Sequence, residues 1–231
     1  TVGEERDAAS DARLSRAAAQ RLSHYLRSLG GAARGSGTVS SEDLAQAVGV
    51  SAAQVRRDLA ALGHLGQRGI GYDTAGLAGA IRRTLGIDRR WRGVLVGVGN
   101  LARALLRYDG FRAQGFEVVG LFDADPSKIG HIVEGLTVEP VSAIRERVSA
   151  LQAEIGVLTV PSDPAQSVAD SLIASGVRGL LNFAPVLLRT PPTVRVVTVD
   201  LAIQLEQLAF LVQHAGPGGT ETDDAEPAAA P

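Results

Sequence analysis

The sequence predicts an α/β protein of two domains, a small helical domain followed by a doubly wound parallel sheet. Short helical segments fill the chain up to about residue 86, whereas strand and helix patterns alternate from Gly93 onward. Apolar strands linked by helices are typical of parallel sheets that are covered on both faces. We therefore expect a first domain over residues 1–86, ordered from about residue 12, and a second over residues 87–200.

The composition is that of a globular protein. Of the 231 residues, 45% are hydrophobic, enough for one large core or two smaller ones. There is no cysteine, which excludes disulfides and thiolate metal sites, and no two histidines have metal-ligand spacing. No apolar run in the chain is long enough to span a bilayer. Charges occur throughout the first thirty residues, which therefore lack the apolar centre of a signal peptide. We expect a cytoplasmic protein with no metal and no membrane anchor.

Residues 41–60 have the spacing of a helix-turn-helix. Leu44 and Ala45 would line the first helix, Gly49 would end it in the left-handed conformation, and Val55 would face back from the second helix. The second helix then presents hydroxyl, amide and guanidinium groups, which read base edges or bind phosphates in a major groove. The DNA-contacting residues expected on this helix are Ser51, Gln54, Arg56 and Arg57.

Both helices begin at a Ser that has a polar partner three residues later. Ser51 with Gln54 fits a capping box, and Ser40 with Asp43 fits one less closely. These pairs predict helix starts at both positions.

A glycine-rich segment, residues 66–72, resembles the wing that follows such a motif, and Arg68 at its tip could enter a minor groove. Charge supports a nucleic-acid partner: residues 1–92 hold 14 Arg and 9 acids, whereas residues 93–231 hold 9 basic and 16 acidic residues. The first domain is therefore predicted to be a winged helix-turn-helix DNA-binding domain. The contacts expected from the wing are Arg68, Gly69 and Tyr72.

Five apolar, β-rich runs follow, separated mostly by helical stretches. The expected strands cover residues 94–98, 118–122, 155–160, 179–183 and 194–199. The expected helices cover residues 101–108, 141–150 and 164–175. This alternation predicts the doubly wound sheet.

The first of these strands leads into a G-x-G-x-x-A fingerprint. Gly97 permits the tight turn, Gly99 lets the backbone approach a pyrophosphate, and Ala102 allows close helix–strand packing. Asp123, 24 residues after Gly99, ends the next strand. It can accept hydrogen bonds from a ribose and would repel a 2′-phosphate, which favours NAD(H) over NADP(H). The segment expected to bind the dinucleotide is Gly97, Val98, Gly99, Asn100, Leu101 and Ala102.

The second domain is thus predicted to be a Rossmann NAD(H)-binding domain, and we do not expect it to be an enzyme. Hydride transfer needs an acid or base beside the nicotinamide and a substrate-binding surface. His131 lies in a polar loop, and the DNA-binding domain takes the place of a substrate domain. Lys128 either neutralises a phosphate or is simply exposed. An NAD-dependent oxidoreductase with an accessory N-terminal domain is one alternative, and a repressor that senses a CoA-type nucleotide is another.

After Asp200 the pattern becomes helical again over residues 201–215. Leu201, Leu205 and Leu208 form a stripe that further apolar residues widen. So broad an apolar face needs cover on more than one side. The tail, residues 216–231, is rich in Gly, Pro, Ala and acids and is expected to be disordered.

Over residues 14–214 the sequence resembles the Rex family of redox-sensing transcriptional repressors. The similar blocks, in the family's order, are residues 39–59, 66–72, 91–106, 122–130, 158–161 and 181–185. The resemblance implies a homodimer in which the C-terminal helix is domain-swapped between the partner's two domains. It also implies a palindromic operator that is bound with NAD+ or without ligand, released by NADH, and placed before respiratory or fermentation genes.

The resemblance further implies a switch formed by Arg27, Tyr108 and Asp200. The ring of NAD+ is positive and that of NADH is not, so a nearby carboxylate favours the oxidised form in an apolar pocket. Whether Asp200 pairs with Arg27 or Tyr108 would then report the redox state. Residues Asn182, Phe183, Ala184 and Pro185 resemble the family's loop beside the nicotinamide. The remaining residues expected at the cofactor site are Tyr108, Lys128 and Pro161.

Overall fold

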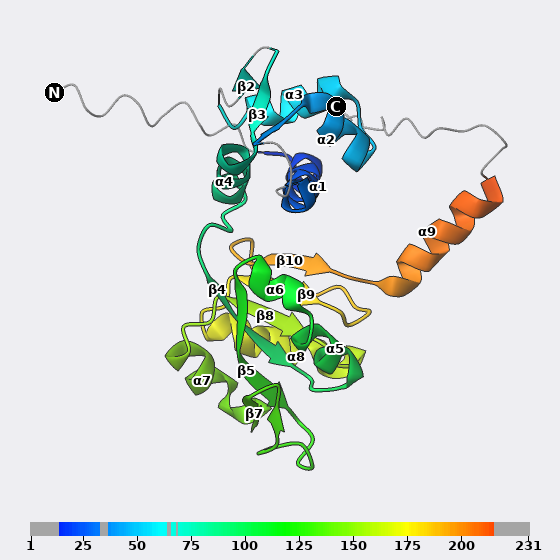
Figure 1. Ribbon diagram of the computed structural model, residues 1–231. Coiled ribbons are helices and arrows are strands. Elements are labelled where there is room, and N and C mark those ends of the chain that lie inside the picture. Colours follow the sequence, from blue (N-terminus) through cyan, green and yellow to red (C-terminus); the bar gives the residue numbers. More distant parts are fainter. Residues whose placement is uncertain (1–13, 33–36, 64–65, 68, 215–231) are drawn as a thin grey trace. The chain divides into compact units, whose positions relative to one another are not determined.

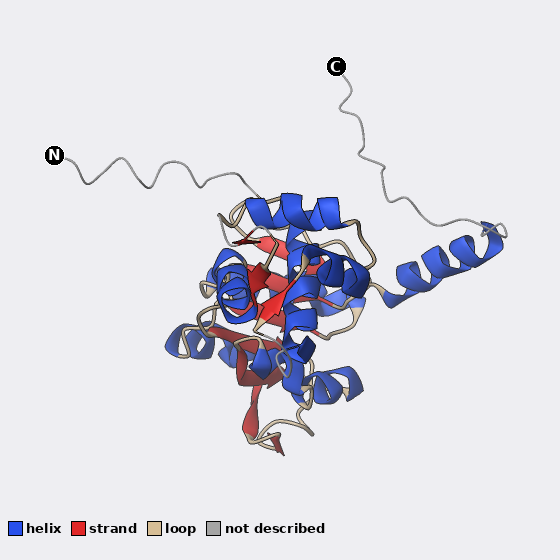
Figure 2. Cartoon of the chain, turned by 45° about the horizontal axis from the view of Figure 1, so that its top comes forward, coloured by secondary structure: helices blue, strands red, loops and turns tan. Residues whose placement is uncertain are grey.

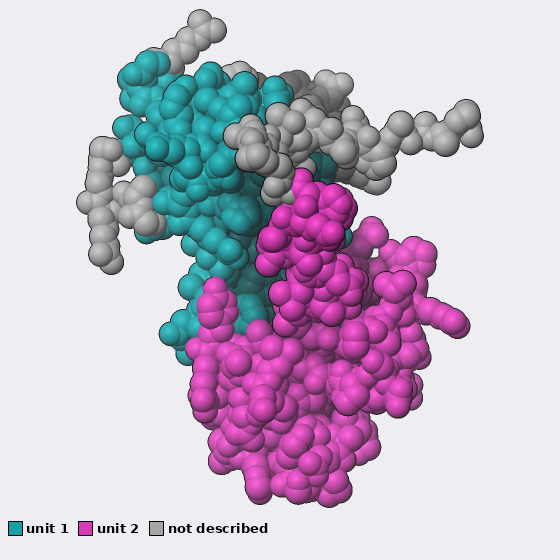
Figure 3. Space-filling model, turned by 90° about the vertical axis from the view of Figure 1, so that its right-hand side faces the viewer, with its two compact units in different colours: residues 1–91, 109–117 teal, residues 92–108, 118–231 magenta. Residues whose placement is uncertain are grey.

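The computed structural model describes residues 14–32, 37–63, 66–67 and 69–214 (Figure 1). It divides into two compact units, each with helices and strands (Figure 2). Unit 1 comprises residues 1–91 and 109–117, and unit 2 comprises residues 92–108 and 118–231 (Figure 3). Three expectations therefore concern residues outside the described ranges. They are the start of order at about residue 12, the contact expected from Arg68 and the disorder expected for residues 216–231.

Unit 1 consists of helices and a small antiparallel sheet of order β1–β3–β2. Its elements are α1 (Arg16–Ala32), β1 (Thr38–Val39), α2 (Ser41–Val48), α3 (Ala52–Ala60), β2 (Gly66–Gln67), β3 (Gly71–Asp73), α4 (Thr74–Thr84) and α6 (Asp109–Ala113). The core side chains contributed by the first four helices include Leu22, Tyr25, Leu29, Leu44, Val55, Leu59, Leu77 and Ile81. These contacts fix α3 against the other helices.

The helix-turn-helix predicted over residues 41–60 is confirmed. Gly49 ends α2 with φ at 78°, and its N–H donates to the carbonyl of Ala45 at 2.9 Å. This left-handed conformation favours glycine because it has no Cβ. Leu44 and Val55 are buried, as the spacing requires.

The two predicted caps differ in their completeness. At α2 the full capping box forms: Ser40 Oγ accepts from the Asp43 N–H at 3.0 Å, and the Asp43 carboxylate accepts from the Ser40 N–H at 3.1 Å. At α3, Ser51 Oγ accepts from the Gln54 N–H at 3.1 Å, but the Gln54 side chain bonds elsewhere. The expectation of a capping box at Ser51 was therefore only half correct.

Unit 2 contains a seven-stranded sheet of order β10–β9–β8–β4–β5–β7–β6. Its elements are β4 (Trp91–Val96), α5 (Asn100–Leu106), β5 (Phe116–Asp123), β6 (Ile132–Val133), β7 (Leu136–Pro140), a 3-10 turn (Val141–Ala143), α7 (Ile144–Ala150), β8 (Ile155–Leu158), α8 (Ser162–Ala174), β9 (Gly179–Asn182), β10 (Arg195–Thr198) and α9 (Leu201–His214). The first residue of β4 and the first two residues of β5 are counted with unit 1.

The strand order is that of dinucleotide-binding sheets. The pairs β10–β9, β9–β8, β8–β4 and β5–β7 are parallel. Without the short β6, the order from β7 to β10 follows the 3-2-1-4-5-6 pattern, whose direction reverses between β4 and β8. Ligands bind such sheets outside the carboxyl ends of the strands, at this reversal. The predicted Rossmann fold is confirmed.

A hairpin that the sequence analysis missed lies at one edge of the sheet. β6 pairs antiparallel with β7, and β7 is the third parallel strand of the Rossmann order. Glu134 and Gly135 form its turn with φ at 48° and 82°. Two positive φ values are the mark of a type I′ hairpin turn. No strand was predicted over residues 132–140, whereas His131 itself lies outside the helices and strands, directly before β6.

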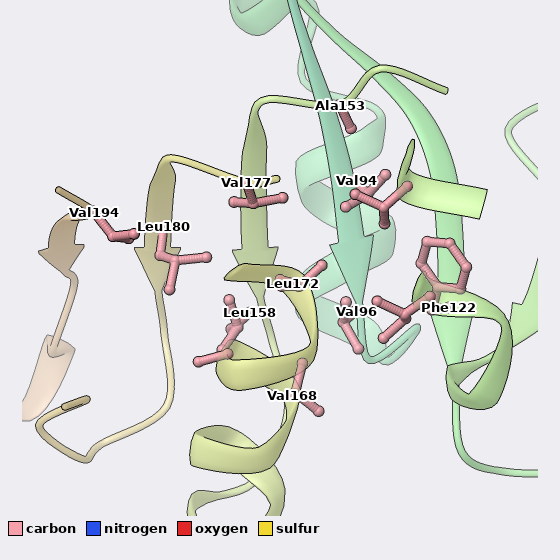
Figure 4. Close-up of a cluster of buried hydrophobic side chains, with 13 residues drawn as sticks. Val94, Val96, Phe122, Ala153, Leu158, Val168, Leu172, Val177, Leu180 and Val194 are labelled. Atoms are coloured by element: carbon pink, nitrogen blue, oxygen red, sulfur yellow. The ribbon is translucent and has the colours of Figure 1, made fainter. Parts of the chain in front are cut away.

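Both faces of the sheet are buried, which explains why its strands lack a polar face. Val94 and Val96 belong to one core cluster, whereas Leu95 belongs to another. Alternate residues of a strand point to opposite faces, so β4 serves both clusters. Figure 4 shows the first cluster, where Phe122 of β5 and Leu172 of α8 pack beside these valines.

Helix α9 begins and ends close to the predicted bounds, at Leu201 and His214. All of its residues are exposed; Leu205 is 65% and Val212 is 72% exposed. So large an exposed apolar surface marks an interaction site. Within the described ranges, no helix combines the length and apolar character needed to span a membrane.

Candidate DNA-binding and nucleotide-binding sites

The exposed side of α3 carries most of the predicted DNA contacts. Ser51, Arg56 and Arg57 are exposed, whereas Gln54 is half-buried. Arg56 pairs with Glu42 of α2 at 2.9 Å, and both side chains are more than half exposed. An exposed ion pair of this kind contributes little to stability, so Arg56 can exchange its partner for a phosphate at small cost.

A buried carboxylate on α3 was missed by the sequence analysis. Asp58 is 6% exposed and receives two hydrogen bonds from the Arg21 guanidinium, at 2.7 and 2.8 Å. The Tyr25 hydroxyl donates to it at 3.0 Å, and Gln54 Nε2 donates at 2.8 Å. The signal that was available is its position: Asp58 lies between buried residues of α3, and a buried carboxylate needs partners.

The partners of Asp58 determine its charge state. Burial alone would raise the pKa of this carboxyl, but hydrogen bonds from Arg21, Gln54 and Tyr25 outweigh burial and hold the pKa below its ordinary value. Burial and the hydrogen bond to Asp58 raise the pKa of Tyr25, which therefore remains a neutral donor. Asp58 is ionised at neutral pH.

We expect unit 1 to lose stability as the pH falls below about 3.9, the ordinary pKa of an aspartate. The pKa of Asp58 is lower in the folded chain than in the unfolded chain. Its stabilising effect is thus complete above the unfolded value and is lost as the pH falls through the folded value. Asp58→Asn should cost about 1–3 kcal/mol at neutral pH. Urea unfolding at a series of acid pH values should show a shallower pH dependence in this variant, and an unchanged dependence would contradict the assignment.

The wing follows the prediction in outline. Gly69 and Ile70 lie at its tip, and Ile70 is 60% exposed. Tyr72 is half-buried against the helical core and lies over Gly66, where a Cβ would come within 2.8 Å of the tyrosine ring. This placement gives Tyr72 a packing role in the wing. A groove of about 560 Å³ runs between α2, α3 and the wing, with Arg56 and Tyr72 in its lining.

The glycine loop after β4 is held in shape by two neighbouring strand ends. Gly97 has φ at 94°, and a Cβ there would lie 2.6 Å from the carbonyl oxygen of Thr159. Thr159 Oγ1 donates to the Gly97 carbonyl at 2.7 Å, and the Val98 N–H donates to Asp123 Oδ2 at 2.6 Å. Gly97 is therefore required for conformation and for space. Thr159 was not predicted to be part of this loop, because nothing in the neighbouring sequence indicates the contact.

The start of α5 is suited to a phosphate group. Gly99 is the N-cap, and it makes no side-chain cap bond. A Cβ added to Gly99 would meet no atom within 4 Å, so the backbone can be approached from outside. Asn100 and Leu101 are exposed, whereas Ala102 is fully buried against the sheet as predicted. The first amide groups of a helix favour anions, and this geometry fits a pyrophosphate.

Asp123 is buried and accepts several hydrogen bonds that were not predicted from the sequence. It is 6% exposed, and besides Val98 it accepts from the Asp125 N–H at 2.9 Å and from Lys128 Nζ at 3.0 Å. Burial alone would raise its pKa, but these hydrogen bonds together lower it. A carboxylate offers about four acceptor positions, so about one remains on Oδ1 for a ribose hydroxyl. Lys128 pairs with Asp123, and its expected contact with a phosphate stays a prediction.

The loop after β9 is organised by Asn182. This side chain is fully buried; its Nδ2 donates to the carbonyls of Ala184 and Val186 at 3.0 and 2.9 Å, and its Oδ1 accepts from the Ala184 N–H at 3.0 Å. Asn182 therefore shapes the loop instead of offering its amide to a ligand. Phe183 is half-buried and Pro185 is exposed.

The predicted cofactor residues lie in loops at the carboxyl ends of the strands. The glycine loop, Asp123, exposed Pro161 and the loop after β9 follow the carboxyl ends of β4, β5, β8 and β9. The predicted cofactor residues thus lie where a dinucleotide-binding sheet takes its ligand. Within the described residues, no group of His, Asp or Glu side chains could hold a metal ion.

The three predicted switch residues occur in both units. Arg27 is exposed on α1 of unit 1, and Tyr108, 58% exposed, follows α5 in unit 2. Asp200 caps α9, since its Oδ1 accepts from the N–H groups of Ala202 and Ile203 at 2.9 and 3.3 Å. The joint action of the three residues stays a prediction.

A winged helix-turn-helix and a dinucleotide-binding sheet on one chain define a ligand-responsive transcriptional regulator. A family model described as "Putative DNA-binding protein N-terminus" matches residues 13–60, and one described as "CoA binding domain" matches residues 88–186. The redox-sensing transcriptional repressors Rex of Rhodopirellula baltica and Desulfitobacterium hafniense are 47% and 49% identical to this chain. The chain belongs to the Rex family of redox-sensing transcriptional repressors.

The similarity extends over most of each protein. The R. baltica repressor aligns over 88% of this chain and 86% of its own, and that of D. hafniense over 83% and 92%. Among solved structures, RSP in complex with NAD+ and operator DNA has a TM-score of 0.82 at 31% identity, over 87% of this chain and 93% of its own. RSP in complex with NADH has a TM-score of 0.79 at 29% identity, over 88% and 96%. The protein is a repressor and not an enzyme, so the oxidoreductase alternative is set aside.

Proposed function

We propose that this repressor binds palindromic operator DNA through unit 1 and is released when NADH replaces NAD+ in unit 2. One observation carries the proposal. The glycine loop, Asp123 and the loop after β9 lie at the carboxyl ends of the strands, where such a sheet binds a dinucleotide, and the same chain contains a helix-turn-helix. RSP, a Rex-family repressor of similar fold, has been crystallised with NADH and with NAD+ plus operator DNA. These complexes favour NAD(H) over the CoA-type nucleotide considered above.

The residues of unit 2 have distinct parts in this proposal. The backbone from Gly97 to Ala102 would bind the pyrophosphate, and Asp123 would accept one ribose hydroxyl. Lys128 balances the charge of Asp123, while Pro161 and residues 182–185 would border the nicotinamide. When bound, the dinucleotide supplies the change of ring charge between NAD+ and NADH. Arg27, Tyr108 and Asp200 would convert that change into release of DNA.

Two copies of the chain would form the active repressor. A palindrome has two-fold symmetry, and a homodimer with two recognition helices matches it. The exposed apolar side chains of α9 support a domain-swapped contact, in which the helix lies between the two domains of the partner. We place the repressor in the cytoplasm, at respiratory or fermentation genes. Its DNA contacts would be Ser51, Gln54, Arg56, Arg57, Arg68, Gly69 and Tyr72.

One titration tests the proposal. The operator duplex crystallised with RSP, labelled with a fluorophore, is bound by the protein at fixed NAD+, and NADH is added while fluorescence anisotropy is recorded. We expect NADH to release the duplex, and we expect the affinity to fall steeply with salt as basic residues leave phosphates. A duplex of unrelated sequence is the control. Equal binding of both duplexes would refute operator recognition, and binding unaffected by NADH would refute redox sensing.

A further inference from the structure

The buried carboxylate Asp58 connects the interior of unit 1 to the exposed face of its recognition helix. On the inner side, Arg21 and Tyr25 of α1 hold it with three hydrogen bonds. On the outer side, Gln54 Nε2 donates to Asp58 Oδ1 at 2.8 Å. The Gln54 side chain is thus anchored from within the helical core and is not a freely rotating surface amide.

The anchoring of Gln54 determines which of its atoms faces outward. Because Nε2 is bound to Asp58, the amide carbonyl Oε1 is directed away from that carboxylate, and it accepts a hydrogen bond from Arg57 Nη2. Arg57 itself is exposed. A continuous series of charged and polar contacts therefore runs from Arg21 through Asp58 and Gln54 to the guanidinium of Arg57.

Gln54 is consequently poorly placed to read a base by itself. Bidentate recognition of adenine by Gln uses both the carbonyl and the NH₂ group of the amide. Here the Asp58 bond engages the NH₂ group and the Arg57 bond engages the carbonyl. An arginine, by contrast, has a planar fork that matches the O6 and N7 acceptors of guanine.

We propose that Asp58 is a positioning residue for base recognition: through Gln54 it holds the Arg57 guanidinium ready to bind a guanine in the major groove. The inference rests on the proposed operator binding and names the base that the recognition helix reads. Arg57 has a long side chain with many rotamers, so holding its head group before binding lowers the entropy lost on contact. Arg56 differs, because its partner Glu42 is an exposed side chain outside this network.

The test measures sensitivity to a single guanine atom. The operator duplex crystallised with RSP is prepared with 7-deazaguanine at each guanine of a half-site in turn, which removes the N7 acceptor. We expect the parent protein to lose about tenfold in affinity at one of these positions. Arg57→Ala should show no loss there, and Asp58→Ala, which removes the acceptor of the Gln54 hydrogen bond, should show a loss of about threefold or less. Each variant's affinity for an unrelated duplex reports its non-specific binding.

Controls separate positioning from folding. Leu29→Ala destabilises the same core without touching the network, and it should retain the full guanine sensitivity. Should Asp58→Ala fail to fold, Gln54→Ala removes the same connection at a half-buried position and should reduce the sensitivity equally. In Asp58→Ala combined with Gln54→Ala, we expect no further reduction beyond either single change, because both changes break the same hydrogen bond.

The outcomes distinguish this inference from the proposed function. Full guanine sensitivity in Asp58→Ala, or in Gln54→Ala, would overturn the positioning role while operator binding stands. Retained sensitivity in Arg57→Ala would overturn the assignment of guanine to that residue. A parent protein that binds operator and unrelated duplexes equally would overturn the proposed function, and the inference with it.

Discussion

Gly99→Ala is expected to leave the fold intact and to weaken NADH binding by about 100-fold. Gly99 has φ at −97°, which other residues adopt, and its added Cβ would meet no atom within 4 Å. In the proposed complex, however, the methyl group would hold the pyrophosphate away from the first amides of α5. Hydrogen bonds to charged groups contribute about 1.5–3 kcal/mol each, and about 1.4 kcal/mol is a factor of ten.

Calorimetric titration measures the affinity of the variant for NADH, and a thermal melt measures whether its fold is intact. Gly179→Ala is a matched control, because its Cβ would make an ordinary 3.8 Å contact at the opposite, amino end of β9. Gly97→Ala differs again: φ at 94° and a 2.6 Å approach to Thr159 should reduce stability as well as binding. Undiminished NADH affinity in Gly99→Ala would place the pyrophosphate elsewhere.

Weaker NADH binding in Gly99→Ala should also raise the NADH concentration needed to release operator DNA. A ligand changes operator affinity only as far as it binds the free and DNA-bound states differently. Gly99→Ala should therefore bind operator in the absence of NADH and require about 100-fold more NADH for release. A repressor that responds at the parent concentration despite weakened NADH binding would contradict the proposed coupling.

The features that the sequence predicted are those determined by a few neighbouring residues. Gly49 and Gly97 are examples, since both take positive φ values where a turn demands them. The G-x-G-x-x-A pattern correctly predicted that Ala102 packs against the sheet. Periodicity likewise predicted α9 to within about a residue, because a long apolar helix has a strong repeat.

The bonding partners of polar side chains could not be predicted in the same way. Asp58 bonds to Arg21, which is 37 residues away, and only the packing of α1 on α3 brings the two together. Asp123 was correctly predicted at the end of β5, but no sequence pattern indicates that Val98 and Lys128 take two of its acceptor positions. Asn182 was expected beside the nicotinamide, whereas its amide is used within its own loop.

The hairpin of β6 and β7 was missed for a different reason. β6 has two residues and β7 has five, too few for alternation to stand out. The turn uses Glu134 and Gly135, whereas Asn-Gly and Asp-Gly are the strong signals for this turn type. The parallel partner of β7 is β5, which provides the pairing that a strand of this length needs.

Charging the apolar face of α9 is expected to have the second large effect. Leu205→Glu combined with Leu208→Glu places two carboxylates where the side chains are now 65% and 54% exposed in the single chain. If a partner copy buries them, each leucine contributes about 1.5–3 kcal/mol, and a dimer contains four. Sedimentation should then show monomers at micromolar concentration. Operator affinity should fall by about 100-fold or more, since a monomer binds one half-site without its linked neighbour.

The control carries the same charge on the same helix. Gln204→Glu combined with Gln207→Glu adds two carboxylates at polar positions and should leave both the dimer and operator binding nearly unchanged. Both variants add the same charge to α9, so any repulsion between acidic helices is common to them. Only the leucine substitutions remove apolar contacts, and the difference between the variants therefore measures the loss of those contacts. A dimer that survives the leucine substitutions would mean that α9 is not the interface, and the cover for its apolar side chains would then have to come from another protein.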